Sequence, residues 1–484
     1  MAARRRSSSA RARRPRRRRA GARNVLIVNM IPKSLSGEEH QDSEPTIAVN
    51  PANSRQIVGS AFTPDPAEGP NAPIYVSLDG GLTWTLNSIV PSTVADGSAT
   101  ADITVAFGSA SNVLYAGIIR YPFPGDRTRL NVLRTTDVQS AEIMQVLVDR
   151  IGRGVDQPYV QADTIRRGAG KGKDRVYVGS NDFNAVAGNT ATIDRSLDGG
   201  GARPAFKAVR IESRATAGQD GPTVRPAVHA DGTVYAVFHA WRTFDDHTGA
   251  GTADIVVVRD DAAATGARPF TSLVDPGDGK AGIRVVQGAR FNFNGYLGLQ
   301  RTGGDVSIAV DPRDSDVVYV AYNADEDSVY ALHVLRSTDR GRTWSRDLHH
   351  LRDALNPALA INTAGTVGLL YQQLRGAGAA QQWVTRVETT TNGTMWSALT
   401  LARTPAQIPR RQFDPYLGDY DRLMAVGKDF YGVFSASNVP RKANFPNGVV
   451  YQRNANFTTS TLLDVDGTTP VHPSIDPFFF KIAG

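Results

Sequence analysis

The chain has 484 residues, 41% of them hydrophobic, with 46 glycines and 27 prolines, a balance typical of a turn-rich globular protein. It contains no cysteine, which excludes disulfides, thiolate nucleophiles and cysteine-based zinc sites. No uninterrupted apolar run approaches the ~18 residues of a membrane-spanning helix, so no membrane span is expected.

The positive charge of the chain is concentrated in residues 1–23, which contain 11 arginines and no acidic residue. Removing these 11 charges from the net +7 leaves −4 for the rest of the chain. A block of like charges repels itself and buries nothing, so residues 1–23 are predicted to be a disordered tail. They do not form an evident signal peptide, and only they are expected to contact nucleic acid. Residues 24–484 are predicted to form one folded domain.

Seven segments repeat a pattern in which an alternating apolar strand, a turn and a second β-rich strand follow one another. They are residues 45–62, 102–119, 158–181, 225–240, 306–323, 357–374 and 415–437. A third apolar strand follows each of them, at 72–77, 130–135, 191–196, 254–259, 330–337, 382–389 and 448–453. A fourth follows most of these, which predicts an all-β propeller of four-stranded antiparallel blades, seven favoured and six the alternative. Residues 25–30 are predicted to complete the last blade, with residues 461–466 as the rival.

The stretch Ser-x-Asp-x-Gly-x-Thr-Trp occurs twice, each time directly after a third strand. Its copies comprise Ser77, Asp79, Gly81, Thr83 and Trp84, and Ser337, Asp339, Gly341, Thr343 and Trp344. Aspartate accepts hydrogen bonds from turn amides, glycine permits a positive φ, and tryptophan packs between neighbouring sheets. One catalytic site needs one set of groups, whereas a repeating architecture repeats its turns, so both copies are predicted to be structural.

These stretches resemble the Asp-box, or bacterial neuraminidase repeat, of the sialidase-like β-propeller family. The resemblance covers roughly residues 40–455 and implies a soluble, secreted or surface-associated propeller that acts on glycans. A sialidase of this family uses three arginines, a Tyr–Glu nucleophile pair and an Asp acid/base, and its first arginine lies in an Arg-Ile-Pro phrase. Residues 24–76 contain no such phrase, and their only arginine is Arg55, in a turn. The resemblance therefore implies a glycoside hydrolase, exo-sialidase-type at best, or else a non-catalytic propeller that binds glycan or protein through its rim and loops.

The innermost strands of a propeller surround one channel, so residues at their entry ends are expected to converge. These positions hold Glu44, Asp102, Asp156 with Gln157, Arg225, Asp305, Asn356 and Asp414. Five carboxylates and one arginine suit acid/base work on glycosidic bonds, coordination of Ca²⁺, or simply the lining of a solvated channel, and the sequence leaves all three open. No cofactor is required by this prediction.

Three other features are weaker candidates. Tyr416 and Tyr420 lie where the family keeps its nucleophilic tyrosine, although packing in the inner strand is the favoured interpretation. The stretch RFNFNGY at 290–296 suits stacking on sugar rings. The eight histidines show no His-x-x-x-His spacing, and His349–His350 is interpreted as a surface pair.

Overall fold

The computed structural model describes residues 24–61, 71–91, 99–123, 127–153, 155–181, 191–216, 223–245, 247–292, 305–410 and 416–484. Within these ranges the regular structure consists of β-strands and three 3-10 turns of three residues each. The predicted all-β class is confirmed. No helix in this part of the chain is long and apolar enough to cross a membrane.

Six sheets contain four antiparallel strands each, taken in chain order. The first three are β2–β5 (Thr46–Val49, Ile57–Ser60, Asn71–Ser77, Thr85–Pro91), β6–β9 (Ala99–Phe107, Leu114–Phe123, Arg127–Thr135, Gln145–Arg153) and β10–β13 (Asp156–Thr164, Asp174–Asn181, Ala191–Ser196, Lys207–Arg210). The next three are β14–β17 (Val224–Val228, Val234–Phe244, Ala250–Asp260, Ile283–Asn292), β18–β21 (Val306–Asp311, Asp314–Asp325, Tyr330–Ser337, His349–Arg352) and β22–β25 (Ala354–Ile361, Val367–Arg375, Gln382–Thr390, Ser397–Pro405).

A seventh sheet is built from both ends of the described chain. Its strand order is β26 (Arg422–Val426), β27 (Asp429–Ser437), β32 (Ile475–Ile482), β1 (Val25–Asn29) and β28 (Val450–Tyr451). The prediction that residues 25–30 enter this sheet is confirmed, because β1 pairs antiparallel with β32, with Val28 opposite Phe479. The prediction that residues 448–453 form its third strand is wrong. That place belongs to β32, whose three consecutive phenylalanines are fully buried, while β28 pairs only with the outer side of β1.

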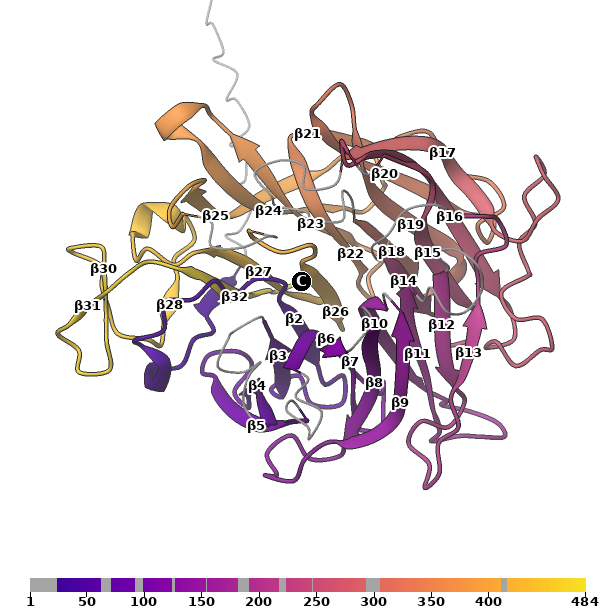
Figure 1. Ribbon diagram of the computed structural model, residues 1–484, viewed down its shortest axis with the longest axis horizontal. Helices are drawn as coiled ribbons and strands as arrows, with labels where there is room; N and C mark the ends of the chain where they lie inside the picture. Colours follow the sequence, from indigo (N-terminus) through magenta and orange to yellow (C-terminus); the bar gives the residue numbers. More distant parts are fainter. Residues whose placement is uncertain are drawn as a thin grey trace, which may run out of the picture.

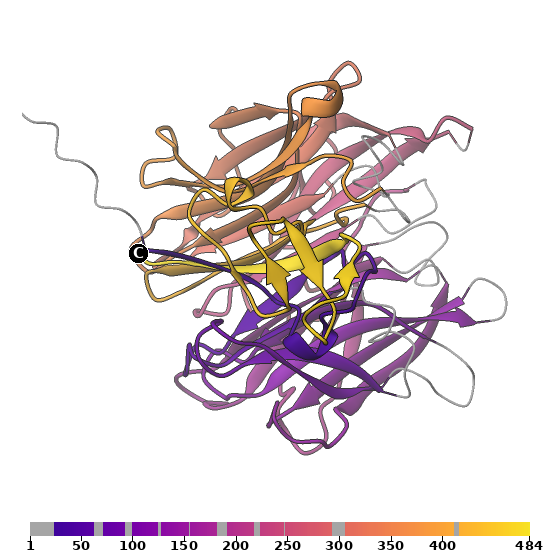
Figure 2. The same cartoon turned by 90° about the vertical axis from the view of Figure 1, so that its left-hand side faces the viewer.

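The rival segment, residues 461–466, contributes to a separate small sheet. Strand β30 (Thr461–Leu463) lies between β29 (Ala455–Asn456) and β31 (Pro470–Val471). This three-stranded sheet lies at the outside of the molecule (Figures 1 and 2). It therefore adds to the periphery and does not complete an inner sheet.

The first strands of the seven sheets lie around the middle of the molecule, and the later strands lie further out (Figure 1). The first strand of each sheet contacts the first strand of the next sheet. The order of these contacts is β2, β6, β10, β14, β18, β22 and β26, and β26 contacts β2 again. Residues at the starts of these strands, hundreds of positions apart in sequence, are therefore neighbours in space.

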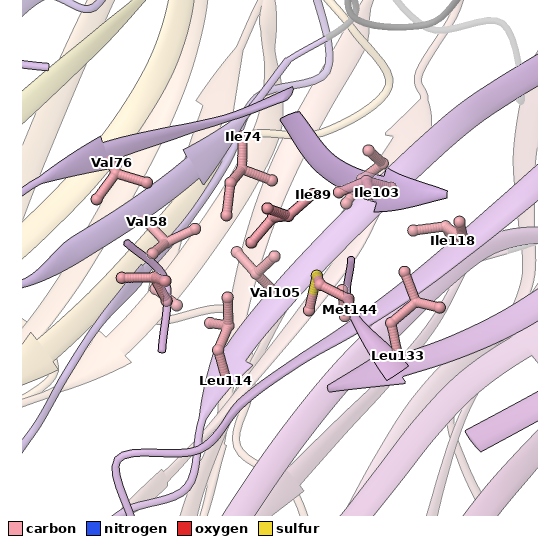
Figure 3. Packing of buried hydrophobic residues seen from close by; sticks show 14 of the residues in the cluster. Val58, Ile74, Val76, Ile89, Ile103, Val105, Leu114, Ile118, Leu133 and Met144 are labelled. Atoms are coloured by element: carbon pink, nitrogen blue, oxygen red, sulfur yellow. The ribbon is translucent and has the colours of Figure 1, made fainter. Parts of the chain in front are cut away.

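The hydrophobic core is divided among the spaces between neighbouring sheets. Figure 3 shows the cluster between the first and second sheets, where Val58 and Ile74 face Val105 and Leu114. Comparable clusters lie between every consecutive pair of the seven sheets, including the seventh and the first, where Val28 and Phe479 pack with Ile47. Each inner sheet buries both faces, because side chains on a strand alternate between its two sides. This packing fixes the radial positions of the inner strands.

Candidate functional site

The turn at residues 77–84 connects β4 to β5, and its polar side chains form hydrogen bonds within the turn. The Ser77 hydroxyl donates to Asp79 Oδ1 at 2.9 Å and accepts from the Gly81 amide at 2.9 Å. Asp79 also accepts from the amide and hydroxyl of Thr83, at 3.0 and 2.7 Å. The indole of Trp84 donates to the Gly81 carbonyl at 3.1 Å, and Gly81 has a φ of +92°.

The turn at residues 337–344, after β20, repeats these contacts one for one. Ser337 donates to Asp339 at 2.7 Å, the amide and hydroxyl of Thr343 donate to the same aspartate at 2.9 and 2.6 Å, and Trp344 donates to the Gly341 carbonyl at 3.1 Å. Burial acts to raise the pKa of Asp339, but the hydrogen bonds from Thr343 and Ser337 outweigh it and lower that pKa to about 2. Both carboxylates are therefore held charged by local donors, as expected of a structural turn.

A second set of polar residues, here called the central ring, lies at the starts of the inner strands. It comprises Glu44, Asp102, Gln157, Tyr159, Arg225, Asp305, Asn356, Asp419, Tyr420, Asp421 and Arg422. Hydrogen bonds and ring contacts connect its members across the middle of the molecule. The Glu44 carboxylate accepts from the amide of Asp419 at 3.2 Å, and Asp419 in turn accepts from the Gln157 side chain at 3.1 Å.

Arg225 and Asp305 form a buried ion pair within the ring. Arg225 Nη2 lies 3.1 Å from Asp305 Oδ1, and the two side chains are 4% and 3% exposed. The same nitrogen donates to the Gln157 side chain at 3.1 Å. Burial raises the pKa of Asp305 to about 6, although the charge of Arg225 and the Val306 amide act against it. Asp305 can therefore exchange a proton near neutral pH.

Tyr420 and Asp102 form a second pair. The tyrosine hydroxyl donates to Asp102 Oδ1 at 3.3 Å, and both residues are 3% exposed. Burial raises the pKa of Tyr420 well above its usual range, and the charges of Asp102 and Glu44 raise it further. The hydroxyl therefore keeps its proton unless a base removes it, and Asp102 is placed to be that base.

Two arginines lie against the ring of Tyr159. The guanidinium carbon of Arg422 is 4.1 Å from the centroid of that ring, and that of Arg225 is 4.6 Å away. Burial lowers the pKa of Arg422, and the nearby charge of Arg225 lowers it further. Within the described structure Arg225 Nη1, Arg422 Nε and Arg422 Nη1 have no hydrogen-bond partner. Unpaired buried donors are costly, and an anion placed among them would remove that cost.

Asp421 is a second buried carboxyl group of the ring with a raised pKa. Burial raises its pKa well above the usual range, the charge of Asp305 raises it further, and the Ser435 amide lowers it. Neither carboxyl oxygen makes a hydrogen bond of normal geometry to another described residue. Burial therefore favours the protonated form of Asp421 over the charged form.

The backbone of the ring is strained at repeat-equivalent positions. Glu44, Gln157 and Asn356 each precede a proline and have φ values of +54°, +47° and +55°. Left-handed backbone at a non-glycine residue costs on the order of 1–3 kcal/mol and persists only where its surroundings enforce it. Gly418, with φ of +112°, lies so close to Glu44 that a Cβ there would be 2.5 Å from the Glu44 nitrogen. The fold therefore holds these polar side chains in fixed positions.

The structure brings together Glu44, Asp102, Arg225, Asp305 and Asn356, which the repeat alignment places at strand entries. It adds Tyr420, a separate candidate, through the hydrogen bond to Asp102. Asp156 is only half-buried and accepts from the adjacent Gln157 amide at 3.0 Å, so Gln157 takes its place in the ring. Asp414 and most of the 290–296 stretch lie outside the described residues.

Tyr416 does not join the central ring. Its hydroxyl donates to the Pro409 carbonyl at 2.7 Å, and its ring packs in an apolar cluster with Trp383 and Ile475. The side chain of Tyr416 is turned into the space between strands. Tyr416 is therefore a packing residue and no longer a candidate for the catalytic tyrosine.

Sequence reasoning missed Tyr159, Asp419, Asp421 and Arg422 as candidates. Two signals were present. Tyr159 lies two positions after Gln157 near the start of its strand, and DYDR at 419–422 is a dense polar run before an inner strand.

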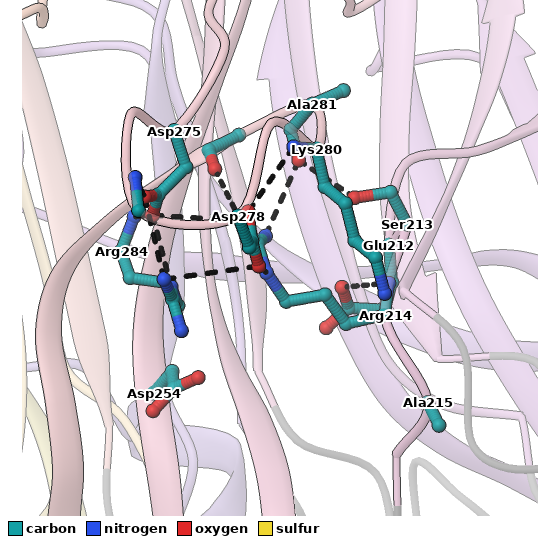
Figure 4. Close-up of polar contacts among 12 residues, drawn as sticks. Glu212, Ser213, Arg214, Ala215, Asp254, Asp275, Asp278, Lys280, Ala281 and Arg284 are labelled. Carbon is teal, nitrogen blue, oxygen red and sulfur yellow. Dashed lines mark hydrogen bonds and ion pairs between the residues drawn. The ribbon is translucent and has the colours of Figure 1, made fainter.

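Another cluster of charges lies at the outer part of the fourth sheet (Figure 4). Arg214 donates to Asp278 at 2.7 and 2.9 Å, and Arg284 donates to Asp275 at 2.9 Å. The hydrogen bond from Arg284 lowers the pKa of Asp275, and that from Arg214 lowers the pKa of Asp278. These charged groups form hydrogen bonds with one another and hold the segment between β16 and β17 in place. They are therefore not a candidate catalytic or binding site.

No family model matches the sequence, and no curated protein matches it. Among solved structures, the chain is similar to an α-L-arabinofuranosidase from Fusarium graminearum, with 11% identity over 94% of this chain and 96% of that one and a TM-score of 0.41. It is also similar to an α-L-arabinanase from Penicillium chrysogenum (12% identity, 94% and 98% covered, TM-score 0.42) and to an ulvan lyase (11% identity, 82% and 92% covered, TM-score 0.49). At these values the likenesses identify neither a family nor an activity.

Proposed function

We propose that the seven sheets are the blades of one β-propeller and that the central ring is a glycosidase site for a glycan that carries a carboxylate. One observation carries the proposal: a buried carboxyl group paired with Arg225, whose pKa burial raises to about 6, lies in the same ring as a tyrosine hydrogen-bonded to a second carboxyl group. Glycosidic bond cleavage needs an acid for the leaving oxygen and a nucleophile or base for the anomeric carbon.

The residues have distinct roles in this proposal. Asp305 protonates the leaving oxygen, since its pKa of about 6 allows it to hold a proton and then release it. Tyr420 attacks the anomeric carbon while Asp102 accepts the hydroxyl proton, and tyrosine is a known nucleophile in such enzymes. The unpaired nitrogens of Arg225 and Arg422 bind the carboxylate of the substrate.

The acidic sugar is favoured by the guanidinium nitrogens of Arg225 and Arg422 that lack a hydrogen bond, and the finer assignment to exo-sialidase chemistry stays part of this proposal. Arg225 and Arg422 supply two guanidinium groups, one fewer than the three that the sialidase resemblance implies. A carboxylate-bearing sugar is therefore proposed as the substrate class, with sialic acid as one member.

The proposal uses no metal ion. Among the described residues, the groups whose ligand atoms lie within 4.8 Å of one another do not include the ring carboxylates. Ca²⁺ is the metal that the sequence predicts as an alternative. Its effect is therefore tested by adding it to the hydrolysis assay described below. Nucleic-acid contact is assigned to the arginine-rich residues 1–23, which lie outside the described residues.

A second candidate is a non-catalytic propeller that binds glycan or protein over its rim and loops. It is favoured by the burial of the ring, because Glu44, Asp102, Arg225, Asp305 and Tyr420 are each 3% exposed or less. Binding over the rim and loops does not require a ligand to reach these buried groups.

The test is hydrolysis of a panel of aryl glycosides and polysaccharides, including sialosides and uronic-acid polymers, by the full chain with Ca²⁺ or with EDTA. We expect cleavage of an acidic substrate, and we expect Asp305→Asn and Tyr420→Phe each to lower kcat by about 10²–10⁴-fold. Thr343→Val, in an outer turn, is the matched control and should keep full activity.

The two candidates give different results. Glycan binding without cleavage, unchanged in Asp305→Asn, would support the second candidate and contradict the first. Neither binding nor cleavage across the panel would contradict both.

A further inference from the structure

A cluster of two histidines and two acids lies on the outer part of the fifth sheet, away from the central ring. His333 in β20 and His350 in β21 are directly paired across the two strands, and their rings stack with centroids 4.9 Å apart. Glu326 comes from the segment between β19 and β20, and Asp347 from the segment between β20 and β21. The proposed glycosidase chemistry uses none of these four polar groups.

The side chains of this cluster converge on one point. Glu326 Oε1 lies 3.4 Å from His333 Nε2, and Glu326 Oε2 lies 3.0 Å from His350 Nε2. One ligand atom from each of these three residues lies within 4.8 Å of the other two. Zinc binds nitrogen and carboxylate oxygen at about 2.0–2.2 Å in tetrahedral geometry, which places ligand atoms about 3.4 Å apart. The three groups therefore need only small adjustments to share one ion.

His333 supplies an independent indication of a ligand. Its side chain is 7% exposed, and its Nε2 has no hydrogen-bond partner among the described residues. Its other nitrogen, Nδ1, lies 2.9 Å from Asp347 Oδ2. When Nδ1–H donates to that carboxylate, Nε2 presents its lone pair towards Glu326, the arrangement that second-sphere carboxylates impose on metal-binding histidines. A buried ring nitrogen that makes no hydrogen bond is costly unless something binds it.

Charge and access are consistent with a divalent cation. Glu326 and Asp347 place two carboxyl groups beside the two imidazole rings, and this combination of donors suits a divalent cation. The side chains of His350 and Glu326 are 42% and 37% exposed, which leaves one side of the cluster open to solvent. Two nitrogens and one carboxylate suit Zn²⁺, whereas Ca²⁺ prefers oxygen ligands throughout.

We propose that Glu326, His333 and His350 form a Zn²⁺ site with one coordination position open, and that Asp347 is a positioning residue for His333. The site joins β20, β21 and the segment before β20, so bound zinc stabilises the outer part of the fifth sheet. It stands independently of the proposed glycosidase function.

The test is titration of the EDTA-dialysed full chain with ZnCl₂ by calorimetry, together with its thermal unfolding. We expect one zinc per chain, a dissociation constant in the micromolar range or below, and a Tm that rises with zinc concentration. His333→Gln and His350→Gln should each weaken binding by about 100-fold or more, and Asp347→Asn by about 10–100-fold.

The matched control is His349→Gln. His349 is the neighbour of His350 in β21 but faces the other side of the strand, where it contacts Glu388 at 2.8 Å and stacks on Trp396 at 4.8 Å. Its substitution should leave zinc binding unchanged. Unfolding of each variant in EDTA separates a loss of metal binding from a loss of folding.

The positioning role of Asp347 has its own readout. Co²⁺ in place of zinc should give visible absorption bands that shift in Asp347→Asn and return in Asp347→Glu. Absence of zinc binding, or equal loss in His349→Gln, would overturn the proposal and show the cluster to be ion pairs only.

Discussion

The pKa values of two aspartates are shifted in opposite directions, one in an outer turn and one in the central ring. Asp339, in the turn after β20, accepts hydrogen bonds from Ser337 and Thr343, and its pKa is lowered to about 2. Asp305, in the ring, is fully buried beside one arginine, and its pKa is raised to about 6. The residue type is the same, and the balance between local donors and burial decides the difference. A satisfied carboxylate holds a turn, whereas an under-satisfied one is available for proton transfer.

The largest effect on stability is expected at the first outer turn. Trp84 is 2% exposed and meets Phe479 of the seventh sheet edge-on, with ring centroids 5.4 Å apart. Trp84→Ala should therefore destabilise the protein by about 3–5 kcal/mol, as measured by urea unfolding. Trp344 is only half-buried, so Trp344→Ala should cost clearly less. Equal losses would show that the two turns are not distinguished by what their tryptophans cover.

The next effect tests whether the backbone of the ring is held as tightly as its contacts indicate. In Gly418→Ala the new Cβ meets the Glu44 backbone at 2.5 Å, and φ is +112°, so we expect a loss of about 2–4 kcal/mol. Gly80, in the outer turn, has a φ of +84° with nothing within 4 Å of a Cβ. Gly80→Ala is therefore the matched control, with a cost of about 1 kcal/mol from backbone strain alone. Similar Tm values for the two variants would contradict the close approach at Glu44.

The pH dependence of stability should have opposite signs in the two regions. Asp305 has a raised pKa in the folded state. Its contribution to the free energy of unfolding is therefore present below about pH 4 and is lost as pH rises to about 6, a change of about 3 kcal/mol. Asp339 has a lowered folded pKa, so its contribution is present above about pH 4 and is lost as pH falls to about 2.

Chemical denaturation from pH 2 to 8 checks both signs. Asp305→Asn should reduce the loss of stability between pH 4 and 6. Part of this loss should remain in the variant, because the pKa of Asp421 is also raised. Asp339→Asn should reduce the loss below pH 4 and leave the range from 4 to 6 unchanged. A wild-type slope that persists in Asp305→Asn would contradict the raised pKa.

The smallest effect is expected from a single hydroxyl in an outer turn. Thr343→Val removes one hydrogen bond of 2.6 Å to Asp339 and should cost about 1 kcal/mol. It should leave hydrolysis or glycan binding unchanged, because the turn lies outside the ring. A change in either activity would remove the distinction between structural turns and functional ring.

Much of the fold could be predicted because its signals are local. The hairpins appear as alternating apolar residues bounded by turn residues. The hydrogen bonds that Ser77, Asp79, Gly81, Thr83 and Trp84 make with one another span four positions or fewer. The ring positions Glu44, Asp102, Arg225 and Asp305 followed from the repeat, since equivalent residues occupy equivalent places. Strand β32 was missed because its partners, β27 and β1, lie at opposite ends of the sequence.

The sequence by itself determined that Glu44, Asp102, Arg225 and Asp305 stand at the inner ends of the strands and that the two Ser-to-Trp stretches close outer turns, because both follow from short-range pattern and repetition. Only the tertiary structure decided that Gln157 replaces Asp156 in the ring, that Tyr416 packs while Tyr420 meets Asp102, and that His333 faces His350. These outcomes depend on strand register and on burial. Register pairs residues without regard to their spacing in sequence, and burial sets each pKa through neighbours that the sequence does not place.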